Sequence, residues 1–226
     1  MTPSLIRVGR SESPVVVVDD AVPDVDAVVD LAAALAPFPS VASSYYPGVR
    51  RVLTAADGAA HDYATALLRS LAPFIGGAFD VDGFDWIEGS FSIVTADPAR
   101  LSPAQRAPHF DSTDPGYLAV LHYLSDTPGT GTAFYRQRST GIECVDAANR
   151  ETFVAAARRD STALSGYTNA SNAAFERIGA VEGRRNRVVL YQGSLLHSGI
   201  IPAAMPLSAD PRVGRLTANL FIQAHR

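Results

Sequence analysis

Apolar positions in the N-terminal part of the chain follow first a strand-like and then a helical pattern. The β-branched run Val15–Val18 has the length and composition of a short buried strand. From Val25 to Leu35 apolar side chains recur at helical spacing, and Asp24 can cap the resulting helix. A second helix is predicted from about Asp57 to Leu71, with Pro73 after its end.

From residue 87 onward the pattern changes to that of strands. Short segments rich in β-branched and aromatic residues are separated by Gly, Pro, Asp or Asn, which is typical of an all-β region. The predicted strands are Ile87–Thr95, Tyr117–Ser125, Thr132–Arg138, Arg187–Tyr191, Leu195–Ile201 and Leu216–Ile222. The stretch Asp126–Gly131 predicts a hairpin or bulged connection between two of them. Residues 43–51 are predicted to form a loop rich in aromatic and cationic groups.

This order of elements predicts a single domain, residues 1–226, that is mainly β with flanking helices. We expect residues 87–224 to form a double-stranded β-helix, that is, a jelly roll of cupin-like architecture. A partly helical insertion at about 146–183, with Asp146 as a cap, interrupts its strands. Residues 1–86 supply an N-terminal strand and a helical buttress that packs on this core.

Composition narrows the possible partners. The 226 residues are 47% hydrophobic, with 19 basic and 23 acidic side chains and a formal charge of −4, which lacks the basic footprint of nucleic-acid binding. A single cysteine, Cys144, excludes an internal disulfide and is interpreted as a small buried hydrophobe. No apolar run has the length of a signal-peptide core or a membrane span. We expect a cytoplasmic monomer or homodimer that binds a small molecule, but neither nucleic acid nor a membrane.

Two short motifs carry candidate metal ligands. In an extended segment, His109 and Asp111 project to the same side because side chains two residues apart share a face. His197 lies in an apolar strand, where a lone histidine is more often a core or surface residue than a ligand. Two histidines and one carboxylate on one face of iron(II) leave adjacent coordination positions open for a co-substrate. Together, these residues predict an iron site.

The strand that begins at Arg215 has two different faces. Period-two alternation places Arg215, Thr217 and Asn219 on one face and the apolar residues of Leu216–Ile222 on the other. An ordinary half-exposed strand has the same pattern. However, a guanidinium beside a hydroxyl also makes a good seat for a carboxylate. A 2-oxo acid that binds iron through its keto oxygen and C1 carboxylate needs such an anchor for its far carboxylate.

The ordered set of His109-x-Asp111, His197 and Arg215-x-Thr217 resembles the 2-oxoglutarate/iron(II)-dependent dioxygenase superfamily. Tyr117–Ser125 followed by Gly131–Phe134 is similar to a strand pair of its prolyl-hydroxylase-like and phytanoyl-hydroxylase-like branch. In that branch, a tyrosine matching Tyr123 contacts the co-substrate. The stretches Tyr46–Arg50 and Phe134–Arg138 are similar to a small bacterial group of uncharacterised members.

The resemblance has two departures. The glycine pair usual in that branch is Gly131-Thr132 here. The basic anchor is Arg215 rather than the lysine of many collagen-type hydroxylases, which argues against collagen-like substrates more than against the reaction.

The resemblance implies a cofactor set of iron(II), 2-oxoglutarate as co-substrate and dioxygen. It implies oxidation of an unactivated C–H bond, by hydroxylation or by desaturation or oxidative ring closure, while 2-oxoglutarate is decarboxylated to succinate and CO2. Halogenation is disfavoured because halogenases of this superfamily usually have a small residue where Asp111 stands. We expect a small substrate, an amino acid or amino-acid-derived metabolite, in a biosynthetic pathway.

Candidate substrate residues are less defined. Arg136 and Arg138 share a strand face, and Arg50 and Tyr46 lie in the predicted N-terminal loop. One of these arginines could hold an α-carboxylate, although each could equally be a surface residue in solvent. The insertion at about 146–183 could be a lid, a packing helix or a dimer contact.

Three further histidines receive no role. His122 alternates away from Tyr123 and is expected to point out of the cavity, whereas His61 falls in a helix and His225 in the C-terminal tail.

Two alternatives belong to other functional classes. One is a cupin-like metalloenzyme that does not use 2-oxoglutarate, against which the pair Arg215 and Thr217 argues. The other is a non-catalytic ligand-binding jelly roll in which the histidines and Asp111 are incidental.

Overall fold

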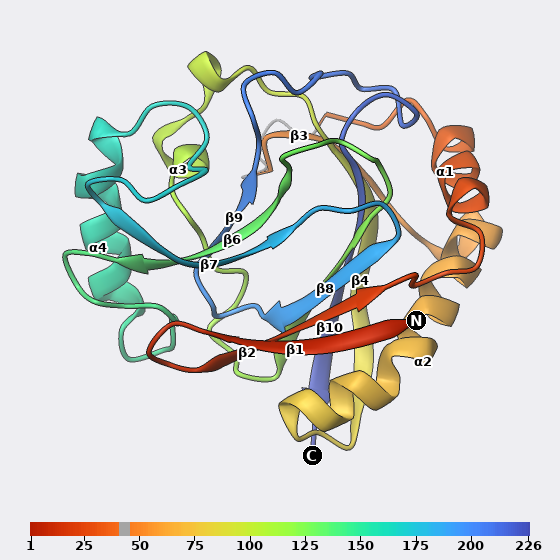
Figure 1. The fold of residues 1–226 in the computed structure, drawn as a ribbon, viewed down its shortest axis with the longest axis horizontal. Helices are drawn as coiled ribbons and strands as arrows, with labels where there is room; N and C mark the ends of the chain where they lie inside the picture. The colour runs from red at the N-terminus through yellow and green to blue at the C-terminus, as the bar shows by residue number, and fades with distance from the viewer. Residues whose placement is uncertain (41–45) are drawn as a thin grey trace.

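A computed structural model describes residues 1–40 and 46–226 of the chain. Its strands form two antiparallel sheets that face each other, a seven-stranded sheet in the order β1-β2-β8-β5-β10-β4-β3 and a three-stranded sheet in the order β7-β6-β9 (Figure 1). The strands are β1 Thr2–Val8, β2 Ser13–Asp19, β3 Gly48–Val52, β4 Gly83–Val94, β5 Tyr117–Tyr123, β6 Gly131–Gln137, β7 Phe175–Glu182, β8 Arg187–Gln192, β9 His197–Ile200 and β10 Leu216–His225. The helices are α1 Val25–Ala34, α2 Ala59–Phe79, α3 Pro103–Arg106 and α4 Arg150–Asp160. The fold is therefore the predicted double-stranded β-helix with flanking helices.

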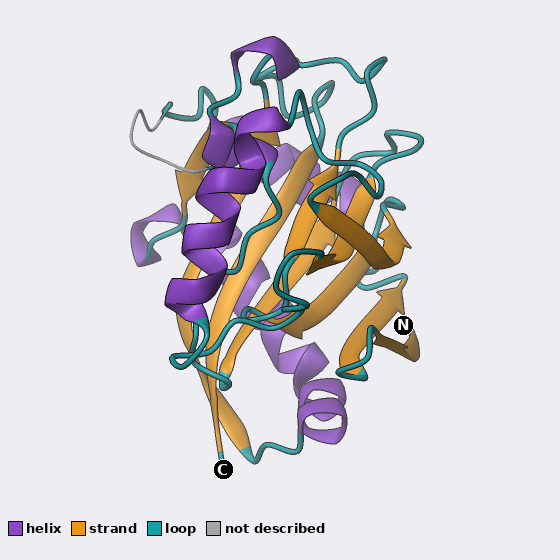
Figure 2. Ribbon diagram, turned by 90° about the vertical axis from the view of Figure 1, so that its left-hand side faces the viewer, coloured by secondary structure: helices purple, strands orange, loops and turns teal. Residues whose placement is uncertain are grey.

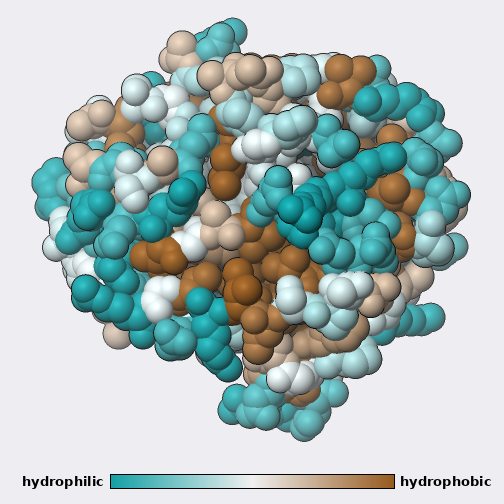
Figure 3. Space-filling model, in the orientation of Figure 1, coloured by the Kyte–Doolittle hydropathy of each residue, from teal (hydrophilic) through white to brown (hydrophobic). Residues whose placement is uncertain are grey.

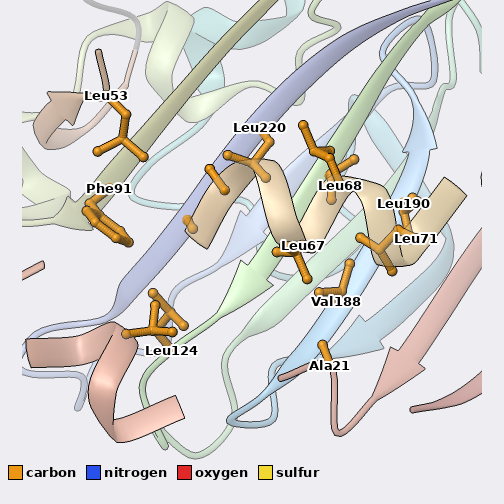
Figure 4. Close-up of a cluster of buried hydrophobic side chains, with 14 of the residues drawn as sticks. Ala21, Leu53, Leu67, Leu68, Leu71, Phe91, Leu124, Val188, Leu190 and Leu220 are labelled. Carbon is orange, nitrogen blue, oxygen red and sulfur yellow. The ribbon is translucent and has the colours of Figure 1, made fainter. Parts of the chain in front are cut away.

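The N-terminal helices cover the outer face of the seven-stranded sheet. Asp24 caps α1 as predicted, since its carboxylate accepts a hydrogen bond from the Ala27 amide at 3.0 Å. Figure 4 shows leucines of α2 packed against strand residues in one buried cluster. This cluster includes Leu67, Leu68, Leu71, Ile75, Phe91, Val188, Leu190, Leu216 and Leu220. The main apolar core thus lies between the helices and the sheet, outside the barrel.

Helix α2 is longer than the sequence predicts. It continues through Pro73 to Phe79, although a proline inside a helix removes one backbone hydrogen bond. Ile75, beyond the proline, is fully buried, and Phe74 and Phe79 pack against the same core. Burial of these side chains offsets the cost of the lost hydrogen bond, so the end predicted at Leu71 is wrong.

The strand prediction missed three strands and misplaced one connection. β1 and β7 lie at the edges of their sheets, and β3, which the sequence predicts as loop, pairs with β4. Residues 43–45 of that predicted loop lie outside the described residues. The connection 126–130 is not a hairpin, because β5 belongs to the seven-stranded sheet and β6 to the three-stranded one. It carries the chain from one sheet to the other.

The insertion contributes both a helix and a strand. The predicted cap at Asp146 is wrong, because Asn149 immediately precedes α4. Asp146 instead accepts hydrogen bonds from the backbone of Ala148 and Asn149 in the turn before the helix. Phe153 and Ala156 of α4 are buried, and Phe153 packs with residues of β6, β7 and β9 on the small sheet. Figure 2 views the molecule from this side, with α4 in front of the strands. The helix of the insertion is therefore a packing helix, and its β7 extends the small sheet.

A second apolar cluster fills one end of the space between the sheets. It contains Val15, Val17, Phe134, Val189 and Tyr191, with Ile6 and Ile178 partly buried against it. Figure 3, in the orientation of Figure 1, shows apolar residues near the middle of the visible face of the molecule, with hydrophilic residues around them.

In the described part of the chain, none of the helices is both long and apolar enough for a membrane span.

Candidate metal centre

Three side chains predicted as ligands meet between the two sheets. His109 and Asp111 come from the extended segment before β5, and His197 is the first residue of β9. Their ligand atoms all lie within 4.8 Å of one another, and within residues 1–40 and 46–226 this is the one such cluster found. Asp111 Oδ1 is 3.7 Å from His109 Nε2, and Asp111 Oδ2 is 3.5 Å from His197 Nε2.

Backbone hydrogen bonds hold the triad in this arrangement. The amides of His109 and His197 each donate to the carbonyl of the other residue at 2.9 Å, which forms an isolated antiparallel bridge. The Asp111 amide donates to the carbonyl of Gly193 at 2.7 Å. The segment that carries His109 and Asp111 is therefore held by backbone hydrogen bonds to β9 and to the β8–β9 connection.

The tautomer of His197 is set by its surroundings. Its Nδ1 donates a hydrogen bond to the carbonyl of Leu195 at 2.8 Å, because a carbonyl oxygen can only accept. The Nε2 lone pair is then free on the side that faces Asp111. Burial lowers the pKa of His197 to about 4, so this ring is neutral near pH 7 and can act as a ligand.

The other two ligands share this electrostatic environment. Although the His109 side chain is partly exposed, the protein atoms packed around its ring desolvate it and, together with the neighbouring His197, lower its pKa to about 4, while Asp111 acts in the opposite direction. Burial raises the pKa of Asp111, against the effect of His109 and Arg50. Asp111 Oδ2 is buried and has no hydrogen-bond partner among the described residues, so it is an acceptor that a cation would satisfy. Two neutral imidazoles and this carboxylate oxygen fit a divalent transition metal.

The site is open on one side. The side chain of His109 is 55% exposed, whereas those of Asp111 and His197 are 15% and 6% exposed. A metal held by the triad would therefore be reached from the side of His109.

The predicted carboxylate anchor is buried close to the triad. Arg215, Thr217 and Tyr123 are 4%, 1% and 2% exposed. The Arg215 guanidinium lies 5.6 Å from the centroid of the Tyr123 ring, and its Nη2 donates to the Gly131 carbonyl at 3.1 Å. Its Nε is buried and has no partner in the part of the chain that the structure describes. A guanidinium with an unused donor can bind a carboxylate by donating a hydrogen bond to it.

A buried tyrosine links the anchor and the triad electrostatically. Burial and nearby Asp111 raise the pKa of Tyr191 well above its usual value, while Arg215 acts against them. The Tyr191 ring also packs against His197, with ring centroids 4.7 Å apart, and Tyr191 and Tyr123 belong to one buried cluster. Tyr191 and Tyr123 therefore connect the triad with Arg215, which lies over the Tyr123 ring.

The four candidate substrate residues fall into two groups. Arg136 forms ion pairs with Glu143 and Glu176, and Arg138 donates to the carbonyl of Asn172 at 2.9 Å. The structure does not bring these two arginines to the triad by any contact among the described residues.

Arg50 and Tyr46, in contrast, lie near the site. Arg50 lowers the pKa of Asp111, and burial raises the pKa of Tyr46 against the effects of Arg215, Arg50 and Thr217. A role in substrate binding remains a prediction for all four residues.

Sequence reasoning missed several polar side chains on the inner face of the large sheet. Glu88, Ser90 and Ser92 of β4 alternate with Phe91 and Ile93, which belong to the core outside the barrel. This alternation within the predicted strand Ile87–Thr95 was the signal that could have identified them.

His122 lies on the outer face of the sheet, as expected. Its Nδ1 is 2.7 Å from the Tyr63 hydroxyl, and its Nε2 is 3.2 Å from Asn186 Oδ1. Cys144 is only partly buried and its Sγ lies 3.3 Å from Ser13 Oγ, so the prediction of a buried hydrophobic cysteine is wrong.

Comparison with known proteins adds a family and a fold. The model of DUF6445, a family of unknown function, matches residues 1–222. No curated protein matches the sequence.

Several solved structures are similar over most of this chain. The epimerase SnoN from nogalamycin biosynthesis, in complex with Fe3+, alpha ketoglutarate and nogalamycin RO, has a TM-score of 0.55 and 14% identity, over 92% of this chain and 78% of that one. HygX from Streptomyces hygroscopicus, with nickel and 2-oxoglutarate bound, has a TM-score of 0.52 and 16% identity, over 93% and 83%. These likenesses establish a shared fold, the double-stranded β-helix.

Proposed function

We propose that this chain, which belongs to the DUF6445 family of unknown function, is an iron(II)/2-oxoglutarate-dependent oxygenase. It would oxidise an unactivated C–H bond of a small molecule while 2-oxoglutarate is decarboxylated to succinate and CO2. The observation that carries the proposal is the triad His109, Asp111 and His197, which packed tyrosine rings connect to the buried anchor Arg215. The shared fold with SnoN and HygX, both crystallised with the same co-substrate, supports it.

The chain contributes binding and orientation. The triad would hold the metal, and Arg215 with Thr217 would hold the distal carboxylate of 2-oxoglutarate, with Tyr123 beside it. When bound, iron(II) with 2-oxoglutarate and dioxygen supplies the oxidising power that no amino-acid side chain has. Burial raises the pKa of Tyr123, so its hydroxyl remains protonated and adds no negative charge next to the co-substrate.

The substrate and its fate remain finer proposals. An amino acid or amino-acid-derived metabolite is the class that we infer, oxidised by hydroxylation or by desaturation or ring closure. Arg50 and Tyr46 have the better position for contact with it, and Arg136 and Arg138 are the more remote candidates. SnoN and HygX have been crystallised with nogalamycin RO and hygromycin B, respectively, which agrees with a small-molecule substrate.

An anaerobic titration tests the proposal directly. Purified metal-free protein is titrated with iron(II) and then with 2-oxoglutarate while the visible spectrum is recorded. We expect a weak metal-to-ligand charge-transfer band that needs both additions and is missing in His109→Ala and His197→Ala. Iron binding without the band would favour a cupin-like metalloenzyme that does not use 2-oxoglutarate. Failure to bind iron would favour a non-catalytic jelly roll and end the oxygenase assignment.

A further inference from the structure

A strip of polar side chains extends from the Arg215 anchor across the inner face of three strands. In the β10–β4 register, Thr217 is paired with Ser92 and Asn219 with Ser90, and in the β3–β4 register Arg50 is paired with Ser92. Ser90 and Ser92 are completely buried, and their hydroxyl oxygens lie 3.2 Å apart. Because serine is small, these positions carry less side-chain volume than Phe91 and Ile93 on the opposite face of β4.

Two polar atoms on this strip lack partners. Arg50 Nη2 donates to Glu88 Oε1 at 2.7 Å and to Ser90 Oγ at 2.9 Å, but Arg50 Nε is buried and unpaired among the described residues. The same holds for Asn219 Oδ1, on the strand next to Ser90. One donor and one acceptor, on either side of a buried serine, are thus left for a ligand.

The charge of this strip indicates what kind of group it binds. Glu88 neutralises Arg50, and Nη2 is already occupied, so the guanidinium does not offer a free edge for a substrate carboxylate. A hydroxyl group both donates and accepts, and can therefore accept from Arg50 Nε and donate to Asn219 Oδ1. Ser92 is paired with Thr217 of the predicted anchor on one side and with Arg50 on the other, so the strip begins at the predicted co-substrate site.

We propose that Arg50, Ser90 and Asn219 form a substrate subsite that binds an uncharged hydroxyl group of the substrate, beside the metal centre. This inference rests on the proposed oxygenase function. It narrows the substrate class to hydroxyl-bearing small molecules, including hydroxylated amino acids and their derivatives. It also assigns to Arg50 a neutral hydrogen-bonding role in place of a carboxylate seat.

Matched pairs of compounds that differ by one hydroxyl group test the subsite. Iron-loaded protein with 2-oxoglutarate is assayed for stimulated succinate formation with threonine and valine, serine and alanine, tyrosine and phenylalanine, and ribose and 2-deoxyribose. We expect stimulation by at least one hydroxyl-bearing member, with a KM that is about tenfold to a hundredfold lower than that of its partner, because loss of the hydroxyl leaves two buried groups unpaired. Stimulation by none of the hydroxyl-bearing members, or equal KM values within the stimulating pairs, would overturn the subsite.

Substitutions then assign the effect to the strip. Asn219→Leu should raise the KM of the hydroxyl-bearing compound by about tenfold and remove the preference over its partner. Gln223→Leu, also an amide-to-leucine change, lies four residues further along β10, at a side chain that hydrogen-bonds to Asp114, and should leave both KM values unchanged. The charge-transfer band reports whether a variant is folded and loaded, and Ser90→Ala replaces Asn219→Leu if the band is lost.

The two proposals fail differently. Absence of the band in the parent protein contradicts the oxygenase function itself. A normal band in Asn219→Leu, together with an unchanged preference for the hydroxyl-bearing compound, contradicts only the subsite and indicates that water occupies the strip.

Discussion

Strand β10 has an apolar outer face and a polar inner face, because apolar and polar side chains alternate along its first half. On the outer face, Leu216, Ala218, Leu220 and Ile222 are all fully buried under the helices, and no polar side chain interrupts them. On the inner face, Thr217 and Arg215, which immediately precedes the strand, are nearly as well buried, yet they carry a hydroxyl and a charge. Burial alone therefore does not separate core from site. What differs is whether the buried groups satisfy one another.

Two buried histidines show the same contrast. The pKa of His122 on the outer face and that of His197 on the inner face are both lowered to about 4, mainly by burial. His122 has partners at both ring nitrogens, whereas His197 has one at Nδ1 and keeps Nε2 toward Asp111. A histidine with hydrogen-bond partners at both ring nitrogens stabilises the fold, whereas one with a free ring nitrogen is available to a ligand.

The largest effect is expected from Asp111→Asn on the inner face. Loss of the charged ligand should lower turnover by about a thousandfold or more, equivalent to roughly 4 kcal/mol of transition-state free energy. The metal-free variant should nevertheless unfold at higher denaturant concentration, because burial of the Asp111 carboxylate is unfavourable, as its raised pKa indicates. Succinate release and urea unfolding measure the two effects. A variant that is inactive and also less stable would contradict this separation.

On the outer face, pH should alter stability through His122. Its pKa is about 4 in the folded state and about 6.5 when unfolded, so the unfolded state binds more protons between these values. The free energy of unfolding should therefore fall as pH drops from 6.5 to 4, by about 3 kcal/mol from this residue. His122→Gln should remove that part of the decrease. Both proteins are compared metal-free, so that the contributions of His109 and His197 cancel.

Truncation of the outer face should affect stability and leave the site intact. Leu220→Ala should lower the free energy of unfolding by about 3 kcal/mol, since it leaves a cavity in the core of Figure 4. Iron affinity of the folded protein should not change. Ile87→Ala, at a position on β4 that is 54% exposed, is the control and should cost less than about 0.5 kcal/mol. A large loss of iron affinity in Leu220→Ala would show that the two faces are coupled.

The smallest effect concerns the anchor hydroxyl. Thr217→Val keeps the shape of the side chain and removes the group predicted to bind the distal carboxylate. We expect the KM for 2-oxoglutarate to rise by about tenfold, or roughly 1.4 kcal/mol, with unchanged iron binding. Thr162→Val, at an exposed site in the insertion, should not change this KM. An unchanged KM in Thr217→Val would remove Thr217 from the anchor.

The parts of the fold with strong periodicity were predictable from the sequence. The alternation along β10, the apolar run of β2 and the cap at Asp24 all led to the correct element. The edge strands β1 and β7 were not found, because their many exposed residues do not alternate in polarity. Their strand conformation comes from pairing with β2 and β6, which is information that no local window of sequence contains.

The candidate site also has a part that was predictable from the sequence and a part that was not. Residue types and order suggested the triad and the anchor. The structure brings the ligand atoms of the triad within 4.8 Å of one another and buries Arg215 over the Tyr123 ring. The Arg50–Glu88 pair could not be inferred, because it depends on β3 lying beside β4, and residues 48–52 have the composition of a loop. Contacts between neighbouring strands depend on topology and register, which the side-chain pattern of a single strand does not determine.

The paired amides of His109 and His197 also determine how the site assembles over time. Because each residue is both donor and acceptor to the other, the two ligand segments cannot separate without breaking two backbone hydrogen bonds together. The chain therefore positions the ligands before any ion arrives, unlike small zinc domains that fold only when the metal binds. In hydrogen exchange, these two amides should be protected in the metal-free protein, and a chelator should remove the metal without melting the barrel.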